Sequence, residues 1–347
     1  MFLKIIKRMI MLNKLLSQII DNYALYRLHK DRSQISHYKR ISLPIPVDEV
    51  NEFYAEPKLP ILQLNYTLQQ KNYMMGYYKY ESEVQDNGIN NRFSIGTFYQ
   101  NLKNDKSINI ILVHGWRMEN IERLNNLYLK DFLKLGYNVY HFTLPYHFER
   151  NSNDSLYNGE LMISADVDRT LISIKQAVSD LRALICWLKE NGSGKVILIG
   201  ISLGGFITNL TSVIDKKIDA LISVMYANSL AYSVWHTVPG KYIKEDFMAN
   251  DFTYDMLKQH WALITPSLFK PQIPKDKILL FSGLYDKYVV KEDTDLLWES
   301  WERPKRIIYD CGHAGIVLYK KTIAKDTVSF ISEPPPPTLH VEVGASS

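Results

Sequence analysis

The stretch KVILIGISLGGFITNL, residues 195–210, decides the expected fold. It begins with an apolar run typical of a strand buried on both faces, continues with Gly-Ile-Ser-Leu-Gly-Gly, and ends in a second apolar run. Glycines two residues before and after Ser202 let a strand and a helix approach each other across a sharp turn. The stretch therefore predicts a strand, a tight turn that exposes the Ser202 hydroxyl, and a helix.

Strand and helix patterns alternate along the chain on both sides of this turn. The alternation predicts an α/β fold, with a mostly parallel central sheet and helices on both faces. Strands are expected within residues 92–100, 108–116, 137–147, 195–202, 218–228, 276–286 and 303–315. Helices are expected within residues 119–136, 164–192 and 324–332. Ser164 is the expected N-cap of the second helix, and Gly192 its expected stop.

Departures from this alternation define the expected domains. Residues 1–70 are predicted to form an N-terminal helical extension, helical at first and then irregular, and residues 71–332 the α/β domain. Within that domain, residues 228–274 are amphipathic and aromatic and predict a helical insertion, with packing helices and a substrate-facing lid as the two interpretations. Four consecutive prolines make residues 333–347 a stiff, exposed tail.

Composition narrows the function classes. The 347-residue chain is 46% hydrophobic, enough for one enlarged domain. Its 41 Lys and Arg residues nearly balance 37 Asp and Glu residues, and the formal net charge of +4 argues against nucleic acid as a partner. The two cysteines, Cys186 and Cys311, are too few for a disulfide framework or a metal cluster and indicate reduced thiols in a cytoplasmic protein.

Residues 1–20 are apolar but are interrupted by Lys4, Lys7, Arg8 and Lys14. No run reaches the roughly 18 apolar residues that a membrane-spanning helix needs. The core between Arg8 and Lys14 is also too short for a signal peptide. The apolar residues keep helical spacing, and two interpretations stay open: the helix packs on the domain, or it lays a basic amphipathic face on a membrane surface.

A serine hydroxyl needs a base to accept its proton and a carboxylate to orient that base. Both residue types follow Ser202 along the chain: Asp286 comes directly after one apolar strand, and His313 after the next. Loops at the carboxyl ends of strands are where open α/β sheets place their ligand sites. The order serine, acid, histidine therefore predicts a catalytic triad of Ser202, Asp286 and His313.

Other residues compete for two of these roles. Asp293, Asp295 and Asp310 are alternative acids, but the first two fall where a helix begins and Asp310 would share a strand end with His313. His147 and His236 are alternative bases. His313 is preferred because the CGHAG turn, residues 311–315, leaves its ring beside small residues.

From about residue 93 to residue 332 the chain resembles the α/β-hydrolase superfamily, with HGWRMEN, LPYHFER and the helix of residues 164–188 similar to esterase, lipase or dienelactone-hydrolase-like members. The resemblance implies an oxyanion hole formed by the backbone N–H groups of Leu203 and Trp116. His114 is interpreted as a structural residue that braces this loop.

Substrate contacts are expected from Arg117 and from the loop at residues 144–150, which follows a strand end. Tyr146, His147 and Arg150 are the candidates in that loop, with Arg150 facing an anionic or polar acyl portion. The alternative is a loop held down by salt bridges.

The sequence therefore predicts a serine hydrolase that cleaves a small-molecule carboxylic ester through an acyl-enzyme, with no metal or organic cofactor implied. A thioesterase, an amidase or an acyltransferase would use the same residues. A non-catalytic binding protein of the same fold is the alternative from another class.

Overall fold

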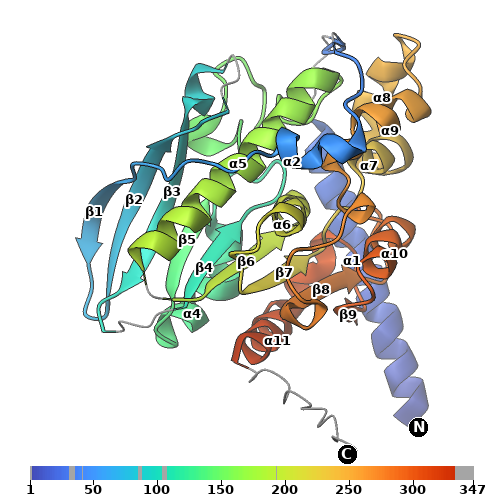
Figure 1. Cartoon of the computed structure of the whole chain (residues 1–347). Coiled ribbons are helices and arrows are strands. Elements are labelled where there is room, and N and C mark those ends of the chain that lie inside the picture. Colours follow the sequence, from blue (N-terminus) through green and yellow to red (C-terminus); the bar gives the residue numbers. More distant parts are fainter. Residues whose placement is uncertain are drawn as a thin grey trace, which may run out of the picture.

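The computed structural model describes residues 2–30, 36–40, 42–84, 88–103, 108–192 and 194–332. The predicted Pro-rich tail, residues 333–347, lies outside the described residues. The strands form one sheet in the order β1-β2-β3-β5-β4-β6-β7-β8-β9 (Figure 1). Their bounds are β1 Gln63–Gln69, β2 Tyr73–Glu81, β3 Phe93–Asn101, β4 Asn109–Val113, β5 Asn138–Phe142, β6 Val196–Ile201, β7 Ala220–Val224, β8 Ile278–Gly283 and β9 Lys305–Tyr309.

The sheet from β5 to β9 is parallel, whereas β1, β2 and β3 pair antiparallel and β3 joins β5 antiparallel. After β4 the chain adds β5 on one side of that strand and later β6 on the other. The order of strands therefore reverses at β4. In open α/β sheets, ligand sites form outside the carboxyl ends of the strands at such a reversal.

The central strands read as continuous apolar runs because both faces of the sheet are covered. Along β6, Val196 and Leu198 belong to one core cluster, and Ile197 and Ile199 belong to the other. Alternate side chains of a strand point to opposite faces, so a strand between two helix layers needs apolar residues at every position. This explains the run that precedes Ser202.

Helices cover both faces of the sheet, with α5 and α6 packed in one cluster and α4 and α11 in the other (Figure 1). The helix bounds are α1 Phe2–Lys30, α2 Val50–Phe53, α3 Glu122–Leu124, α4 Lys130–Lys134, α5 Val167–Asn191, α6 Leu203–Ile214, α7 Leu230–His236, α8 Lys241–Met248, α9 Tyr254–His260, α10 Lys291–Ser300 and α11 Lys320–Ser332. The expected α/β architecture with a mostly parallel sheet is confirmed.

Two local predictions were wrong. Strand β1 lies inside residues 1–70, which were predicted as a helical and irregular extension, so the sheet starts before residue 71. Most of its side chains are exposed, as at a sheet edge, and its pattern lacks the apolar alternation of a half-buried strand. The N-cap of α5 is Asp166 rather than Ser164, because the Asp166 carboxylate accepts the Arg169 N–H at 3.0 Å. Gly192 follows the last residue of α5, as expected.

Residues 228–274 contain α7, α8 and α9, in agreement with a helical insertion. Three of its aromatic side chains, Phe247, Phe252 and Trp261, are buried, and Phe247 packs against the other two. These three side chains belong to the same core cluster as α5 and α6, which is the packing interpretation for these residues.

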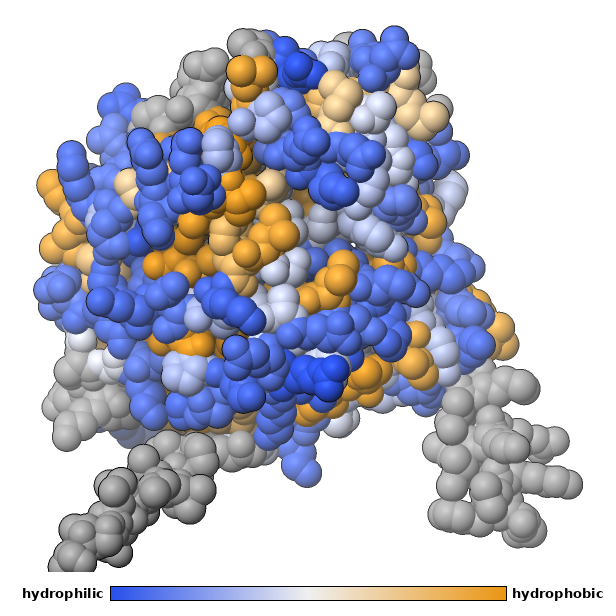
Figure 2. Space-filling view, turned by 45° about the vertical axis from the view of Figure 1, so that its right-hand side comes forward, coloured by the Kyte–Doolittle hydropathy of each residue, from blue (hydrophilic) through white to orange (hydrophobic). Residues whose placement is uncertain are grey.

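Helix α1 runs along the side of the domain, and its N-terminal turns extend away from the body of the molecule (Figure 1). In the part of the chain that the structure describes, no helix has both the length and the apolar content to cross a membrane. Figure 2 shows a molecular face on which hydrophilic residues predominate and hydrophobic residues gather in patches between them.

Candidate active site

Ser202 lies in the turn between β6 and α6 with a strained backbone, at φ 56° and ψ −116°. Positive φ is unfavourable for a residue with a side chain, so the surrounding structure has to hold it there. The Ser202 N–H donates to the Val224 carbonyl at 2.8 Å, and the Ser202 carbonyl accepts the Phe206 N–H at 3.0 Å. The turn is thus tied to the next strand and to the helix that follows, and it leaves the serine side chain partly exposed.

The glycines around Ser202 are required by close backbone contacts. A Cβ atom on Gly200 would lie 2.3 Å from the Gly204 carbonyl oxygen, and one on Gly204 would lie 2.1 Å from the Val113 carbonyl oxygen. Both obstacles are backbone atoms, which cannot rotate away. This confirms the physical reason given for the Gly-x-Ser-x-Gly pattern: the strand and the helix meet too closely for side chains.

Ser202, His313 and Asp286 form one hydrogen-bonded chain. The Ser202 Oγ lies 3.0 Å from His313 Nε2, and His313 Nδ1 lies 2.8 Å from Asp286 Oδ2. Ser202 follows β6, Asp286 follows β8 and His313 follows β9, so three loops at the carboxyl ends of parallel strands bring them together. Each ring nitrogen of His313 thus has one partner, a hydroxyl on one side and a carboxylate on the other.

Asp286 is itself held by its loop. Its second carboxylate oxygen, Oδ1, accepts the N–H groups of Tyr288 at 2.8 Å and Val289 at 3.0 Å. The Tyr288 ring stacks on the His313 ring, with centroids 4.6 Å apart and planes 9° apart. The carboxylate and the imidazole therefore have little freedom to turn away from each other.

Two of the competing residues, Asp293 and His236, have other partners. Asp293 is buried, and its carboxylate accepts the backbone N–H groups of Asn228 and Ser229 just before α7. Burial raises the pKa of Asp293 to about 6, against the opposing effect of these hydrogen bonds. His236 packs against the rings of Tyr232 and Tyr254 in the insertion.

The pKa of His313 is raised above its ordinary value of 6.5. Burial of the ring is the largest effect and lowers the pKa, but the charge and hydrogen bond of Asp286, with the charge of Asp21, outweigh it. The site therefore favours the protonated imidazole, which is the state reached after a proton moves from a serine to the histidine.

Sequence reasoning missed two residues that hold the His313 loop, both in α1. The Asp21 carboxylate accepts three successive backbone N–H groups, from His313 at 3.0 Å, Ala314 at 2.9 Å and Gly315 at 3.1 Å. The Ser17 hydroxyl accepts the N–H of Gly312. Helix α1 thus fixes the backbone on both sides of the histidine.

The CGHAG turn carried a signal of this contact. A Cβ on Gly312 would lie 1.9 Å from the Asp21 carboxylate, and one on Gly315 would lie 2.1 Å from the Ser17 hydroxyl. Both glycines are therefore explained by the close approach of α1. The buried polar pair at Ser17 and Asp21, four residues apart on an apolar helix, was the matching signal at the other end of the chain.

The loop after β4 borders Ser202. A Cβ on Gly115 would lie 3.3 Å from the Ser202 Cβ, and Trp116 follows directly. His114 is buried, and its Nε2 accepts the Leu144 N–H at 3.1 Å, so Nδ1 carries the proton and donates to the Gly115 carbonyl at 2.9 Å. Burial lowers the pKa of His114 to about 4, which agrees with the neutral, bracing role that the sequence suggested. Leu203 is the first residue of α6, where backbone N–H groups have no partner within the helix.

A cleft of about 500 Å³ opens beside this loop. Trp116 and Arg117 line it together with Tyr157, and its other walls come from α1, at His29, and from α8, at Tyr242. Arg117 has a positive φ of 59° and lies over the Tyr157 ring, 3.4 Å from the centroid. Of the four predicted substrate contacts, Arg117 is the one that lines the cleft.

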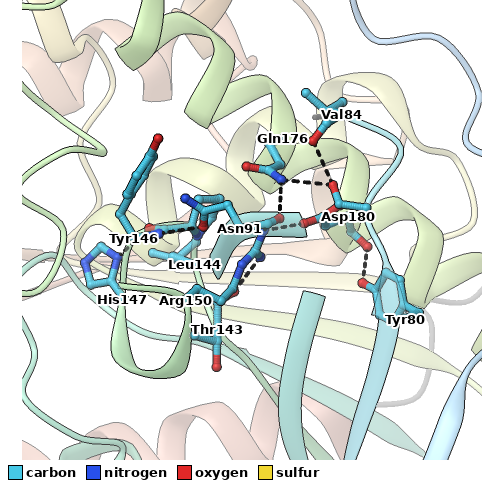
Figure 3. Close-up of polar contacts among 12 residues, drawn as sticks. Tyr80, Val84, Asn91, Thr143, Leu144, Tyr146, His147, Arg150, Gln176 and Asp180 are labelled. Atoms are coloured by element: carbon cyan, nitrogen blue, oxygen red, sulfur yellow. Dashed lines mark hydrogen bonds and ion pairs between the residues drawn. The ribbon is translucent and has the colours of Figure 1, made fainter. Parts of the chain in front are cut away.

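The remaining three, Tyr146, His147 and Arg150, are buried. The Arg150 guanidinium is paired with the Asp180 carboxylate at 2.8 Å and donates to the Thr143 carbonyl at 3.0 Å (Figure 3). The expectation that Arg150 faces the substrate was therefore wrong, and the alternative of a loop held by a salt bridge describes it. A buried guanidinium needs its partners inside the protein, and α5 supplies the carboxylate.

Sequence comparison finds relatives in two bacterial species. The chain is 50% identical over 113 residues to the uncharacterized protein YdjC of Bacillus subtilis, which covers 33% of this chain and 97% of that protein. It is 27% identical over 190 residues to an uncharacterized protein of Mycobacterium tuberculosis, which covers 52% of this chain and 43% of that protein. The chain thus spans less than half the length of the mycobacterial relative.

Structure comparison finds the same fold in many solved structures, which include two acetyl xylan esterases. An acetyl xylan esterase from Paenibacillus sp. R4 matches with a TM-score of 0.59 at 11% identity, over 82% of this chain and 99% of that one. Acetyl xylan esterase 1 from Thermoanaerobacterium sp. JW/SL YS485 matches with a TM-score of 0.58 at 12% identity, over 84% of this chain and all of that one. The model of the alpha/beta hydrolase family matches residues 110–317, more than half of the chain. The chain belongs to the alpha/beta hydrolase family.

Proposed function

We propose that this protein is a serine esterase that cleaves a carboxylic ester through a covalent acyl-enzyme. The observation that carries the proposal is the hydrogen-bonded chain from Ser202 through His313 to Asp286, with the serine on a strained turn that leaves its hydroxyl partly exposed. A nucleophile, a base within hydrogen-bond distance and an orienting carboxylate are the parts that acyl transfer needs.

In the proposed reaction the Ser202 Oγ attacks the ester carbonyl while His313 Nε2 takes its proton. Asp286 keeps the imidazole in the tautomer with the proton on Nδ1 and stabilises the positive charge that forms. His313 then protonates the leaving alcohol. In the second half a water molecule, deprotonated by His313, attacks the acyl-enzyme and releases the acid and the free serine.

The negative charge on the carbonyl oxygen needs donors beside Ser202. The backbone N–H of Leu203 begins α6, whose N-terminus carries partial positive charge. Trp116, which supplies the second N–H, follows Gly115 in the chain, and Gly115 lies beside Ser202 in space. These two groups are the proposed oxyanion hole.

Esters with a small acyl group are the proposed substrates. The two structural neighbours are named acetyl xylan esterases, which supports an ester bond and a short acyl chain. The cleft beside Trp116 has polar and charged walls, including His29, Arg117 and Glu160, and this favours a polar alcohol portion over a long apolar one.

The test combines labelling and turnover. The wild-type chain is treated with a fluorophosphonate probe and analysed by intact-protein mass spectrometry, and hydrolysis of p-nitrophenyl acetate and p-nitrophenyl palmitate is measured in parallel. We expect one label per chain, faster turnover of the acetate, and loss of both label and turnover in Ser202→Ala.

Ser332→Ala is the matched control, because Ser332 is an exposed serine at the end of α11. It should label and turn over like the wild type. Folded wild-type protein that neither labels nor hydrolyses either ester would contradict the proposal and favour a binding protein of the same fold.

A further inference from the structure

Helix α1 departs from the usual arrangement of a surface helix. The side chains that it buries against the domain include the polar Ser17 and Asp21, which bind the loop of His313. A helix on the surface of a globular protein normally turns its apolar stripe inward and its polar residues to solvent. The buried face of α1 therefore combines Ser17 and Asp21 with the apolar Leu25, and a second face, which is apolar, is left on the outside.

The outward face of α1 is a continuous apolar stripe. Its residues recur at spacings of three and four, so they share one side of the helix opposite the buried Ser17 and Asp21. Each of these side chains is between 41% and 65% exposed. The stripe consists of Leu12, Leu15, Leu16, Ile19, Tyr23 and Tyr26. Contiguous exposed apolar surface of this kind marks an interaction site in a folded protein.

Helix α1 also accounts for the net positive charge of the chain. Six of the 41 Lys and Arg residues lie in α1, against one of the 37 acidic residues, so the rest of the chain has 35 basic and 36 acidic side chains. The single acid is Asp21, which is buried against the His313 loop. Among the cations of α1 whose side chains the structure describes, Lys14, Arg27 and Lys30 are exposed, and Arg27 is paired with Glu119. The remainder of the chain is close to neutral.

We infer that α1 binds the surface of an anionic lipid membrane, with its apolar stripe in the boundary between headgroups and acyl chains. An interfacial helix needs an apolar face for the acyl chains and cations for the phosphate headgroups, and α1 supplies both. Tyr23 and Tyr26 suit the interface because each ring has an apolar body and a polar end. This inference does not depend on the proposed esterase activity.

Charge favours a lipid surface over a second copy of the chain. Two α1 helices packed along their stripes would bring together two segments with the same excess of positive charge, and like charges across an interface are unfavourable. An anionic bilayer instead gains from every Lys and Arg near its surface, about 1 kcal/mol each.

Membrane binding would place the cleft near the lipid. The C-terminal end of α1 contributes Leu28 and His29 to the cleft that also contains Trp116. The middle of the helix holds the backbone at His313 through Asp21. One helix thus joins the proposed membrane surface to the candidate active site.

Vesicle co-sedimentation of the full chain tests the inference. Vesicles of phosphatidylcholine alone are compared with vesicles that contain about one third phosphatidylglycerol. We expect partitioning onto the anionic vesicles that is at least about tenfold stronger and that weakens as salt is raised. The double variant Leu16→Glu/Ile19→Glu should lose this binding, because it places two carboxylates in the stripe.

The matched control is Leu43→Glu/Ile61→Glu, which adds the same charge at exposed apolar positions outside α1. It should bind vesicles like the wild type. Circular dichroism melting shows that each variant is folded. Vesicle co-sedimentation of Ser202→Ala separates membrane binding from activity.

Wild-type protein that stays in the supernatant with anionic vesicles would overturn the inference, as would equal pelleting of the wild type and Leu16→Glu/Ile19→Glu. A dimer in light scattering that this double variant abolishes, without vesicle binding, would assign the stripe to a second copy of the chain.

Discussion

The turn that carries Ser202 and the loop that carries His313 are both rich in glycine, but different parts of the molecule hold them in place. Around Ser202 the close contacts come from neighbouring backbone of the sheet, such as the Val113 carbonyl against Gly204. Around His313 they come from side chains of α1, with the Asp21 carboxylate bonded to a backbone N–H that is 292 residues away in the sequence. The backbone of the sheet therefore holds the nucleophile, whereas side chains of the N-terminal helix hold the base.

The largest effect, on kcat, is expected from substitution of Ser202 and His313, the two residues through which these regions contact each other. Ser202→Ala and His313→Gln should each lower kcat for p-nitrophenyl acetate by about 10⁴-fold, and the double variant should be no worse than either, because residues that act as a unit are not additive. Steady-state kinetics on the three variants checks this. A second loss of the same size in the double variant would mean that the two residues act separately.

The Ser202 turn should be intolerant of added volume. Gly204→Ala places a Cβ 2.1 Å from the Val113 carbonyl oxygen, so we expect the free energy of unfolding to fall by about 3 kcal/mol in urea denaturation. Gly192→Ala is the control, because Gly192 is exposed and its nearest contact for a new Cβ is at 3.1 Å. Gly204→Ala protein as stable as the control would contradict the steric origin of this turn.

The His313 loop should behave differently, because a side chain blocks it. Gly312→Ala is expected to lower the free energy of unfolding by about 2 kcal/mol through its clash with Asp21. Asp21→Ala removes every atom of that clash but also removes the acceptor of three N–H groups, at a similar cost of about 2 kcal/mol.

In the double variant Gly312→Ala/Asp21→Ala, the loss of unfolding free energy should therefore be smaller than the sum of the losses in the two single variants. A double-mutant cycle in urea denaturation measures this coupling. Additive effects, within about 0.5 kcal/mol, would show that Asp21 does not hold the loop at Gly312.

The smallest effect concerns pH. His313 has to be neutral to accept a proton, and the charges of Asp286 and Asp21 raise its pKa, so wild-type activity should fall as the pH drops through that raised value. Asp21→Asn removes one charge, and the acid limb of kcat/KM should move to lower pH while kcat changes by less than about tenfold. Asp286→Asn should shift the limb further in the same direction. If the acid limb of kcat/KM did not move in Asp21→Asn, Asp21 would have a purely structural role.

The raised pKa of His313 also makes the stability of the protein depend on pH. Because the pKa of His313 is raised in the folded protein, its contribution to stability is present in full below the unfolded value of 6.5 and is lost as the pH rises through the folded value. The stability difference between the wild type and His313→Gln should therefore shrink with rising pH.

Local chemistry explains which predictions succeeded. The strand, turn and helix around Ser202 could be predicted because the clashes that demand Gly200 and Gly204 involve residues close in the motif or in the adjacent strand. The positions of Asp286 and His313 followed from strands that end just before them. Parallel strands share an edge, so chain order alone indicated that these side chains would meet.

The failures have a common physical cause. Arg150 follows a strand end as a substrate-binding residue would, but Asp180 on α5 takes its guanidinium into the interior. Strand β1 was missed because an edge strand needs little apolar surface. In both cases the outcome depends on a partner that no local pattern identifies.

The sequence by itself determined the class of fold, the strained turn at Ser202, and the concentration of positive charge in α1, since these depend on steric and electrostatic properties of neighbouring residues. Tertiary structure alone decided that Asp21 and Ser17 would hold the His313 loop and that the apolar face of α1 would be left outside. A helical pattern states which residues share a face, but which face is buried depends on the surface that the rest of the chain presents to it.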